Sequence, residues 1–247
     1  MSTSDPLVSV IIPFYNCSYV AQAIESVLSQ TYPHIELLVV NDGSYENQHL
    51  ITPYLSKITY IEQTNKGVAS ALNQGIKHAK GEYLVWLSSD DLISPYKIEH
   101  QLNFMQENNA LISFTCFNII NNDNQITQYN VGKYFKDDIE ILQTLQEFNP
   151  INGCTVMFSK EIIKTIGFFD ENLKYAQDYD YWIRTALHFP IHYFHMTLTN
   201  YRVHEAMGSI RFNKEQNIEF HSVRSKYKII IGKLILEKEK KRRKKKT

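Results

Sequence analysis

The sequence predicts an α/β fold, a mainly parallel sheet with helices on both faces. Short β-branched apolar runs alternate with segments whose apolar residues recur at helical spacing, and a polar cluster follows three of these runs. Near-continuous apolar strands separated by amphipathic helices are typical of buried parallel sheets with right-handed crossovers. A chain of 247 residues with 43% hydrophobic content can bury such a core without disulfides.

The first half of the chain has the more regular pattern. Residues 7–12 (LVSVII) predict a strand ended by Pro13, and Val20, Ile24 and Val27 predict the helix after it. Further strands are expected at residues 35–40, 58–61 and 83–87, with helices at 68–76 and 95–107.

The second half is less regular. Strands are expected at residues 111–120, 153–158 and 192–203, a turn at 121–124, and helices at 138–148, 160–166 and 178–188. We therefore divide a domain of residues 1–212 into a regular half, 1–107, and a looser half, 108–212. Residues 213–247 form a helical, basic C-terminal tail.

Three polar clusters follow the first, second and fourth strands. They are residues 15–16 (YN), 41–44 (NDGS) and 88–91 (SSDD). In open α/β sheets, ligands bind beyond the carboxyl ends of the strands, so we expect the three clusters to share one rim.

Asp90 and Asp91 form a hard-oxygen site of the kind that binds Mg²⁺ or Mn²⁺ and bridges it to phosphates. The alternative is that one of them only caps the next helix. Neither a Gly-x-Gly-x-x-Gly nor a Gly-Lys-Ser/Thr loop is present, so a Rossmann dinucleotide site and a P-loop are not supported. A cation, with Lys66 or backbone amides, would then hold the phosphates.

Several segments together resemble family 2 inverting glycosyltransferases of GT-A fold, as in the synthesis of bacterial surface polysaccharides. They are residues 8–16 (VSVIIPFYN), 40–44 (VNDGS), 65–67 (NKG) with Asn73 and Gly75, 81–83 (GEY), and 89–91 (SDD) with Pro95. The resemblance runs from about residue 7 to 210. It implies a metal-dependent, hexosyltransferase-type enzyme with Mn²⁺ or Mg²⁺ as cofactor. The donor would be a nucleoside-diphosphate sugar, UDP-linked, and the acceptor a saccharide or lipid-linked saccharide.

The resemblance implies a role for each matching residue in the half that would bind the nucleotide sugar. Asp42 would accept a hydrogen bond from the base, Asp90 would contact the ribose, and Asp91 would ligate the metal. Pro13 and Tyr15 would line the base pocket, with Tyr15 stacking on the base. The roles of the three Asp residues suit a carboxylate, which only accepts hydrogen bonds when ionised.

Residues 177–182 (QDYDYW) resemble the family's Glu-Asp motif, which makes Asp178 the candidate general base on the acceptor side. The alternative is an acid that merely favours the first turn of a helix. Residues 201–204 (YRVH) resemble the segment after the last family strand, which assigns His204 to the metal or diphosphate.

The sequence departs from the family pattern at four positions. Ser88 and Asn41 stand where Asp is frequent, Leu72 where Arg is frequent, and Gln177 where Glu is frequent. The four carboxylates with assigned roles are retained, which favours an active enzyme. The departures at Ser88 and Leu72 are expected to affect donor binding.

Two other functions compete with this interpretation. A sugar-1-phosphate nucleotidyltransferase would carry an early glycine-rich basic loop, and residues 13–18 are not one. A non-catalytic sugar-nucleotide-binding or assembly module would bind nucleotide without turnover.

The tail is strongly basic, unlike the rest of the chain. Residues 237–247 hold eight Lys or Arg and two Glu, although the whole chain is neutral. With the apolar residues before it, the tail predicts either a basic helix on an anionic membrane or a helix packed on the domain. A nucleic-acid partner is not expected, because a lone basic run is no recognition fold. Cys17, Cys116 and Cys154 lack disulfide or metal spacing, so we expect a cytoplasmic protein, peripheral on the inner face of the membrane if the tail binds it.

Overall fold

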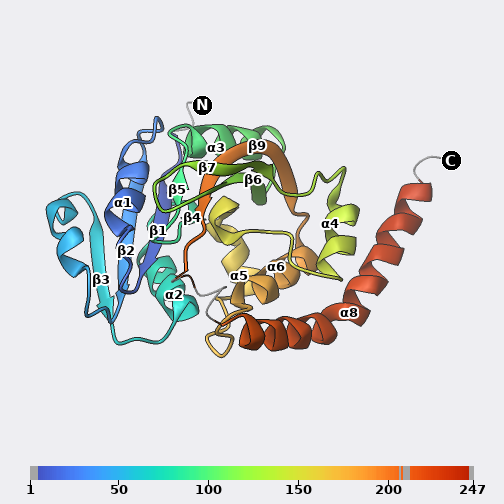
Figure 1. Cartoon of the computed structure of the whole chain (residues 1–247). Coiled ribbons are helices and arrows are strands. Elements are labelled where there is room, and N and C mark those ends of the chain that lie inside the picture. The colour runs from blue at the N-terminus through green and yellow to red at the C-terminus, as the bar shows by residue number, and fades with distance from the viewer. Residues whose placement is uncertain (1–4, 206, 208–211, 245–247) are drawn as a thin grey trace.

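The structure is a computed structural model that describes residues 5–205, 207 and 212–244. It confirms the predicted α/β class: the described residues form a nine-stranded sheet with helices on both faces (Figure 1). The strands are β1 (Val8–Phe14), β2 (Ile35–Asp42), β3 (Thr59–Gln63), β4 (Tyr83–Trp86), β5 (Leu92–Ile93), β6 (Ile112–Ile120), β7 (Ile126–Val131), β8 (Met157–Ser159) and β9 (His192–Arg202).

The α-helices surround this sheet, and short 3-10 turns join some of the elements. The helices are α1 (Val20–Leu28), α2 (Val68–His78), α3 (Lys97–Glu107), α4 (Asp138–Leu145), α5 (Ile163–Ile166), α6 (Gln177–His188) and α8 (Asn213–Lys244). The 3-10 turns are η1 (Gln48–Leu50), η2 (Thr52–Tyr54), η3 (Gly153–Thr155) and η4 (Lys160–Ile162).

The strand order is β3-β2-β1-β4-β8-β6-β9-β5, with β7 paired to β6. The first four strands are parallel, whereas β8 runs antiparallel to both β4 and β6. The chain order reverses between β1 and β4, and such a switch point opens a crevice at the carboxyl ends of the strands.

Alternating residues of the central strands enter two separate hydrophobic cores. Val10 and Ile12 of β1 pack on the face that carries α1 and α3, whereas Ile11 packs on the face that carries α2, α4, α6 and α8. This alternation is what the two-residue period of a strand requires when both faces of a sheet are covered.

Some elements differ from the sequence predictions. Residues 153–158 were expected to form one strand, but they begin with η3 and only then enter β8. The sequence pattern missed β7, whose residues are nearly all exposed, and the two-residue β5. The predicted tail is one continuous helix, α8, up to Lys244, and its last three residues lie outside the described part.

Among the residues that the structure describes, no helix has both the length and the apolar composition needed to cross a membrane.

Candidate functional site

The three polar clusters meet at the carboxyl rim of β1, β2 and β4, as predicted. The Asn16 side-chain oxygen accepts hydrogen bonds from the backbone amides of Tyr45 (2.9 Å) and Glu46 (3.0 Å). The thiol of Cys17 donates to the carbonyl of Ser89 at 3.3 Å. The loop after β1 therefore joins the loops after β2 and β4 into one rim.

Asp42 ends β2 and organises the loop that leads into α2. Its carboxylate accepts hydrogen bonds from the Gln63 side chain (2.7 Å) and from the backbone amides of Lys66 (2.8 Å) and Gly67 (2.8 Å). Only 4% of Asp42 is exposed. Since an ionised carboxylate has about four acceptor positions, these three bonds leave roughly one for a ligand.

The glycine after Asp42 permits this close approach of the two loops. Gly43 has a φ of +70°, and a Cβ there would lie 2.7 Å from the backbone nitrogen of Asn65. Any side chain at this position would therefore be strained and would push the 65–67 loop off the Asp42 carboxylate. The side chain of Lys66, in the same 65–67 loop, is exposed.

Of the two residues predicted to line a base pocket, only Tyr15 presents a ring to solvent. Tyr15 is 47% exposed, and its ring centre lies 6.3 Å from that of Tyr45, at 82° between the planes. Pro13 is buried within β1. Pro13 can shape the rim but not stack on a ligand in this conformation.

Asp90 and His204 come together although they are far apart in the chain. The His204 Nε2 atom lies 3.0 Å from a carboxylate oxygen of Asp90, and the two side chains are 12% and 24% exposed, respectively. The two atoms form a hydrogen bond in this structure. Neighbouring ligands of an octahedral ion with bonds near 2.1 Å also stand about 3.0 Å apart, so the pair would suit two adjacent positions of a Mg²⁺ or Mn²⁺ ion. No group of three or more His, Cys, Asp or Glu among the described residues could hold a metal, so a ligand or water would complete the shell.

Asp91 is the next residue in the same turn. It has no exposed surface, and one carboxylate oxygen accepts a hydrogen bond from the backbone amide of Arg202 at 2.8 Å. Burial, beside the charge of Asp90, raises the pKa of Asp91 well above its usual range. The sequence assigned the metal to Asp91 and the ribose to Asp90. In the structure Asp90 is the more exposed of the two carboxylates, and the second oxygen of Asp91 has no hydrogen-bond partner among the described residues.

Sequence reasoning assigned no role to Arg202, and the structure places it beside Asp90. The fully buried guanidinium donates to the carbonyls of Asp90 and Asn121 and to the side chains of Gln22 and Asn124. Its Cζ atom lies 4.2 Å from the centre of the Tyr19 ring. Because one buried cation ties the Asp90 backbone to α1 and to the turn at residues 121–124, it fixes the turn on which Asp90 is presented.

Asp178 lies at the start of α6, in contact with the chain that follows α4. Its carboxylate accepts hydrogen bonds from the Asn149 side chain (3.0 Å) and the Tyr179 backbone amide (2.6 Å). Burial raises the pKa of Asp178 to about 7, and the nearby Glu219 carboxylate adds to the rise. A carboxylate with a pKa near 7 suits a general base at neutral pH.

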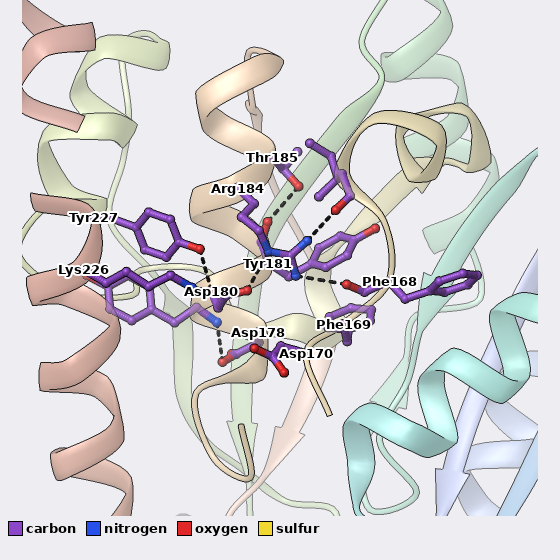
Figure 2. Close-up of polar contacts among 12 residues, drawn as sticks. Phe168, Phe169, Asp170, Asp178, Asp180, Tyr181, Arg184, Thr185, Lys226 and Tyr227 are labelled. Carbon is purple, nitrogen blue, oxygen red and sulfur yellow. Dashed lines mark hydrogen bonds and ion pairs between the residues drawn. The ribbon is translucent and has the colours of Figure 1, made fainter. Parts of the chain in front are cut away.

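Two residues further along α6, Asp180 joins that helix to α8 (Figure 2). Asp180 is 1% exposed, and its carboxylate accepts from Arg184 (2.6 Å), Tyr227 (2.7 Å) and Lys226 (3.2 Å). Arg184 also donates to the Phe168 carbonyl, which ties in the loop before α6. Asp178 and Asp180 thus differ: Asp180 is held by the cations Arg184 and Lys226, whereas the described residues place no cation on Asp178.

A second carboxylate, Glu219 of α8, holds the residues that immediately precede α6. It accepts hydrogen bonds from the backbone amides of Lys174 (3.0 Å), Tyr175 (2.5 Å) and Ala176 (2.6 Å). These amides would otherwise lack partners at the helix N-terminus. Sequence reasoning missed Glu219, since nothing in the sequence places a residue of the tail beside residues 174–176.

A cavity of about 270 Å³ lies between the end of α4, the start of α6 and α8. Its lining includes Phe148, Asn149, Tyr179, Phe220, His221 and Arg224. Asn149 also donates to Asp178, so the wall of this cavity adjoins the candidate base.

The structure does not bring all the predicted site residues into one contact network. In the described part of the chain, Asp178 shares no hydrogen bond with Asp90 or His204. The connection runs through α2, which starts beside the Asp42-bound loop and whose Asn73 side chain bonds with the backbone of Phe169 before α6.

The four departures from the family pattern lie in defined environments. The hydroxyl of Ser88 accepts from the buried Cys154 thiol, and Leu72 is a core residue with 1% exposure. Asn41 bonds to Ser44 and Tyr60, which holds the turn after β2. Gln177 is buried at the start of α6.

Comparison with known proteins identifies relatives over most of the chain. The sequence model of the family described as "Glycosyl transferase family 2" matches residues 9–167, a range that ends before Asp178 and His204. An uncharacterized glycosyltransferase of Rickettsia typhi is 41% identical over 211 residues, 83% of this chain and 66% of the relative. The minor teichoic acid biosynthesis protein GgaB of Bacillus subtilis is 34% identical over 69% of this chain and 20% of its own length.

Solved structures share the fold at lower identity. S. aureus TarS 1-349 in complex with UDP-GlcNAc has a TM-score of 0.67 and 21% identity, over 81% of this chain and 60% of TarS 1-349. The mannosyltransferase PcManGT of Pyrobaculum calidifontis, in complex with GDP-Man and Mn²⁺, has a TM-score of 0.66 and 17% identity, over 90% of this chain and 64% of its own. These likenesses confirm the predicted GT-A fold. The match of the family model over residues 9–167 and the 41% identity to the Rickettsia typhi relative show that the chain belongs to glycosyl transferase family 2.

Proposed function

We propose that the protein transfers a sugar from a nucleoside-diphosphate sugar to a hydroxyl of a saccharide or lipid-linked saccharide, in surface polysaccharide synthesis. The observation that carries this proposal is the outward-facing Asp90–His204 pair, 3.0 Å apart, on the rim that Asp42 organises. The family membership and the relation to GgaB, named for teichoic acid biosynthesis, support it.

The donor would bind along the rim of β1, β2 and β4. The remaining acceptor position of Asp42 suits the N–H of a uracil, and the exposed ring of Tyr15 suits stacking on it. TarS was solved with UDP and UDP-GlcNAc, and PcManGT with GDP-Man, so a UDP-linked donor is the proposal and its sugar stays open. Exposed Lys66 would lie near the diphosphate.

Asp90 and His204 would hold the divalent ion, Mn²⁺ or Mg²⁺, instead of the Asp91 expected from the sequence. When bound, the ion supplies positive charge at the diphosphate. Arg202 and the buried Asp91 would position the turn that carries Asp90 without contacting the ion.

Asp178 would act as the general base. The acceptor oxygen forms a bond to the anomeric carbon while the bond from that carbon to the diphosphate oxygen breaks, and Asp178 takes the hydroxyl proton. A single displacement of this kind inverts the anomeric centre. We place the acceptor at the cavity beside Asn149, where Phe148 is 55% exposed and offers a ring to a sugar face.

We also propose a cytoplasmic protein. The three cysteines are free in the structure, as expected in a reducing compartment.

The test uses the purified 247-residue chain with Mn²⁺ and a panel of sugar nucleotides, scored for release of nucleoside diphosphate with and without acceptor extracts. Release that depends on an extract and is lost in Asp178→Asn is the expected result. A nucleotidyltransferase would release inorganic pyrophosphate from a nucleoside triphosphate and a sugar phosphate, and a binding module would release nothing. No release with any donor, or an Asp178→Asn variant as active as wild type, would contradict the proposal.

A further inference from the structure

Helix α8 has two apolar faces, and the protein covers only one of them. Val223, Tyr227, Ile231 and Ile235 follow one another at four-residue spacing and are all buried. They belong to the core that includes α4 and α6. A helix lying on a domain needs one such stripe and no more.

The opposite face carries large apolar side chains that nothing in the described structure covers. Ile218 is 64% exposed, Ile229 is 75% exposed and Leu236 is 58% exposed. Their separations of 11 and 7 residues are close to whole helical turns, so the three share one face. In Figure 1, α8 runs along the outside of the molecule, and its C-terminal part extends beyond α4.

Along residues 220–236, the charges on this face are of one sign. No Asp or Glu occurs in residues 220–236. Lys233, Lys240 and Arg243 lie on the same side as Ile229 by helical spacing, and all three are exposed. Exposed acids border this stretch at its two ends: Glu215 precedes Ile218 by three residues, and Glu237 follows Lys233 by four.

Other cations of α8 are engaged with the protein itself. Lys238 bonds to Asp138 at 2.5 Å and Arg242 to Asp137 at 2.6 Å, both at the start of α4. These pairs hold the inner side of the helix against the domain. Lys233, Lys240 and Arg243 lie on the other side, which faces outward.

We propose that this outward face, defined by Ile218, Ile229, Lys233, Leu236 and Lys240, docks the protein flat on an anionic lipid membrane. Isoleucine and leucine side chains enter the boundary between head groups and acyl chains, and the lysines contact lipid phosphates. Nucleic acid would attract the lysines but would leave the apolar side chains exposed to water. Membrane binding itself does not depend on the proposed function. Its purpose, to bring the protein to a lipid-linked acceptor, rests on that function.

The test is co-flotation of the purified full-length chain with vesicles, without any substrate. Vesicles of phosphatidylglycerol and phosphatidylcholine in equal parts should carry the protein, and pure phosphatidylcholine should not. Each lysine near an anionic surface contributes about fivefold in binding, so Lys233→Glu with Lys240→Glu should lower it at least 25-fold, and added salt should lower wild-type binding.

An apolar variant separates docking from attraction by charge alone. Ile229→Ser should weaken binding about tenfold, since one buried aliphatic side chain is lost. Leu55→Ser is the matched control: Leu55 is 48% exposed and lies far along the chain, after η2, so its binding should equal wild type.

Three outcomes would overturn the proposal. One is no flotation with anionic vesicles, and another is equal flotation of wild type and Ile229→Ser. The third is a stable dimer in sedimentation velocity that Ile229→Ser dissociates, which would assign the face to a second copy of the chain. Because none of these measurements uses turnover, they stand apart from the success or failure of the proposed function.

Discussion

At the scale of single residues, Asp90 and Asp91 show that adjacent acids can have opposite environments. Asp90 faces His204 at the rim, whereas Asp91 has no exposed surface and bonds to the Arg202 backbone. The sequence locates the pair after a buried strand, but it cannot tell which member faces outward, because that depends on β9 arriving beside the turn.

Substitution by asparagine should separate the two carboxylates. Asp90→Asn removes the charge that faces the proposed ion and should lower turnover at least about 100-fold, with weaker Mn²⁺ binding to the nucleotide complex. Asp91→Asn keeps an oxygen for the Arg202 amide, and the Asp91 side chain has no exposed surface to offer an ion. We therefore expect near-normal activity. Equal loss in both variants would restore Asp91 as a ligand.

The pKa of Asp178 predicts the pH dependence of transfer. Since the base must be ionised and its pKa is about 7, activity should rise with pH, reach half its maximum near pH 7 and level off above it. Well below that pH, the rate should fall about tenfold per unit. Initial rates at saturating donor give the profile, and Asp91→Asn serves as a control that should keep it. A profile flat from pH 5 to 8 would exclude Asp178 as the base.

At the scale of elements, the environment of Asp178 is made by three segments. Asn149 follows α4, Tyr179 belongs to α6, and Glu219 reaches in from α8. Sequence spacing predicted α4 and α6 well, because both have clear apolar periodicity. The contact with Glu219 could not be predicted, since pairing between distant helices depends on tertiary packing.

Glu219→Gln should shift the titration of Asp178. The nearby negative charge of Glu219 raises that pKa, so its removal should lower the midpoint of the pH profile and of the Asp178 carboxyl resonance in ¹³C NMR. Glu215→Gln, four residues earlier on α8 and exposed, is the control and should leave the midpoint in place. If both variants titrate like wild type, Glu219 only supports the backbone of residues 174–176.

The Asp180 cluster should contribute strongly to stability. Asp180→Ala leaves Arg184, Lys226 and Tyr227 without their common acceptor, and breaking such a buried pair costs about 3 kcal/mol in free energy of unfolding. Asp138, which is 30% exposed and pairs with Lys238, offers the comparison: Asp138→Ala should cost less than about 1 kcal/mol. Urea denaturation followed by circular dichroism measures both. Similar losses in the two variants would contradict this difference.

At the scale of the whole molecule, the two predicted halves share one sheet, since β8 of the second half pairs with β4 of the first. The apolar strands and short loops of the first half made its rim predictable from sequence. The second half was predicted less completely: β7 has almost no buried face to give a pattern, and β5 has only two residues.

This arrangement predicts separate losses of binding and turnover. Asp42→Ala releases the loop at Lys66 and Gly67 and should weaken UDP binding at least about tenfold. Asp178→Asn should bind UDP like wild type while losing transfer. Isothermal titration calorimetry with UDP and Mn²⁺ distinguishes the two, and unchanged affinity in Asp42→Ala would remove Asp42 from the donor site.

Because α8 supports the start of α6, the order of synthesis affects when the protein can become active. During synthesis, the strands of the sheet and the residues of the rim leave the ribosome before Glu219, Lys226 and Tyr227 do. A nascent chain can thus form its donor site while the proposed base still lacks its supports. The same helix that would settle the protein on lipid completes the base, so catalysis would begin only once the element for docking exists.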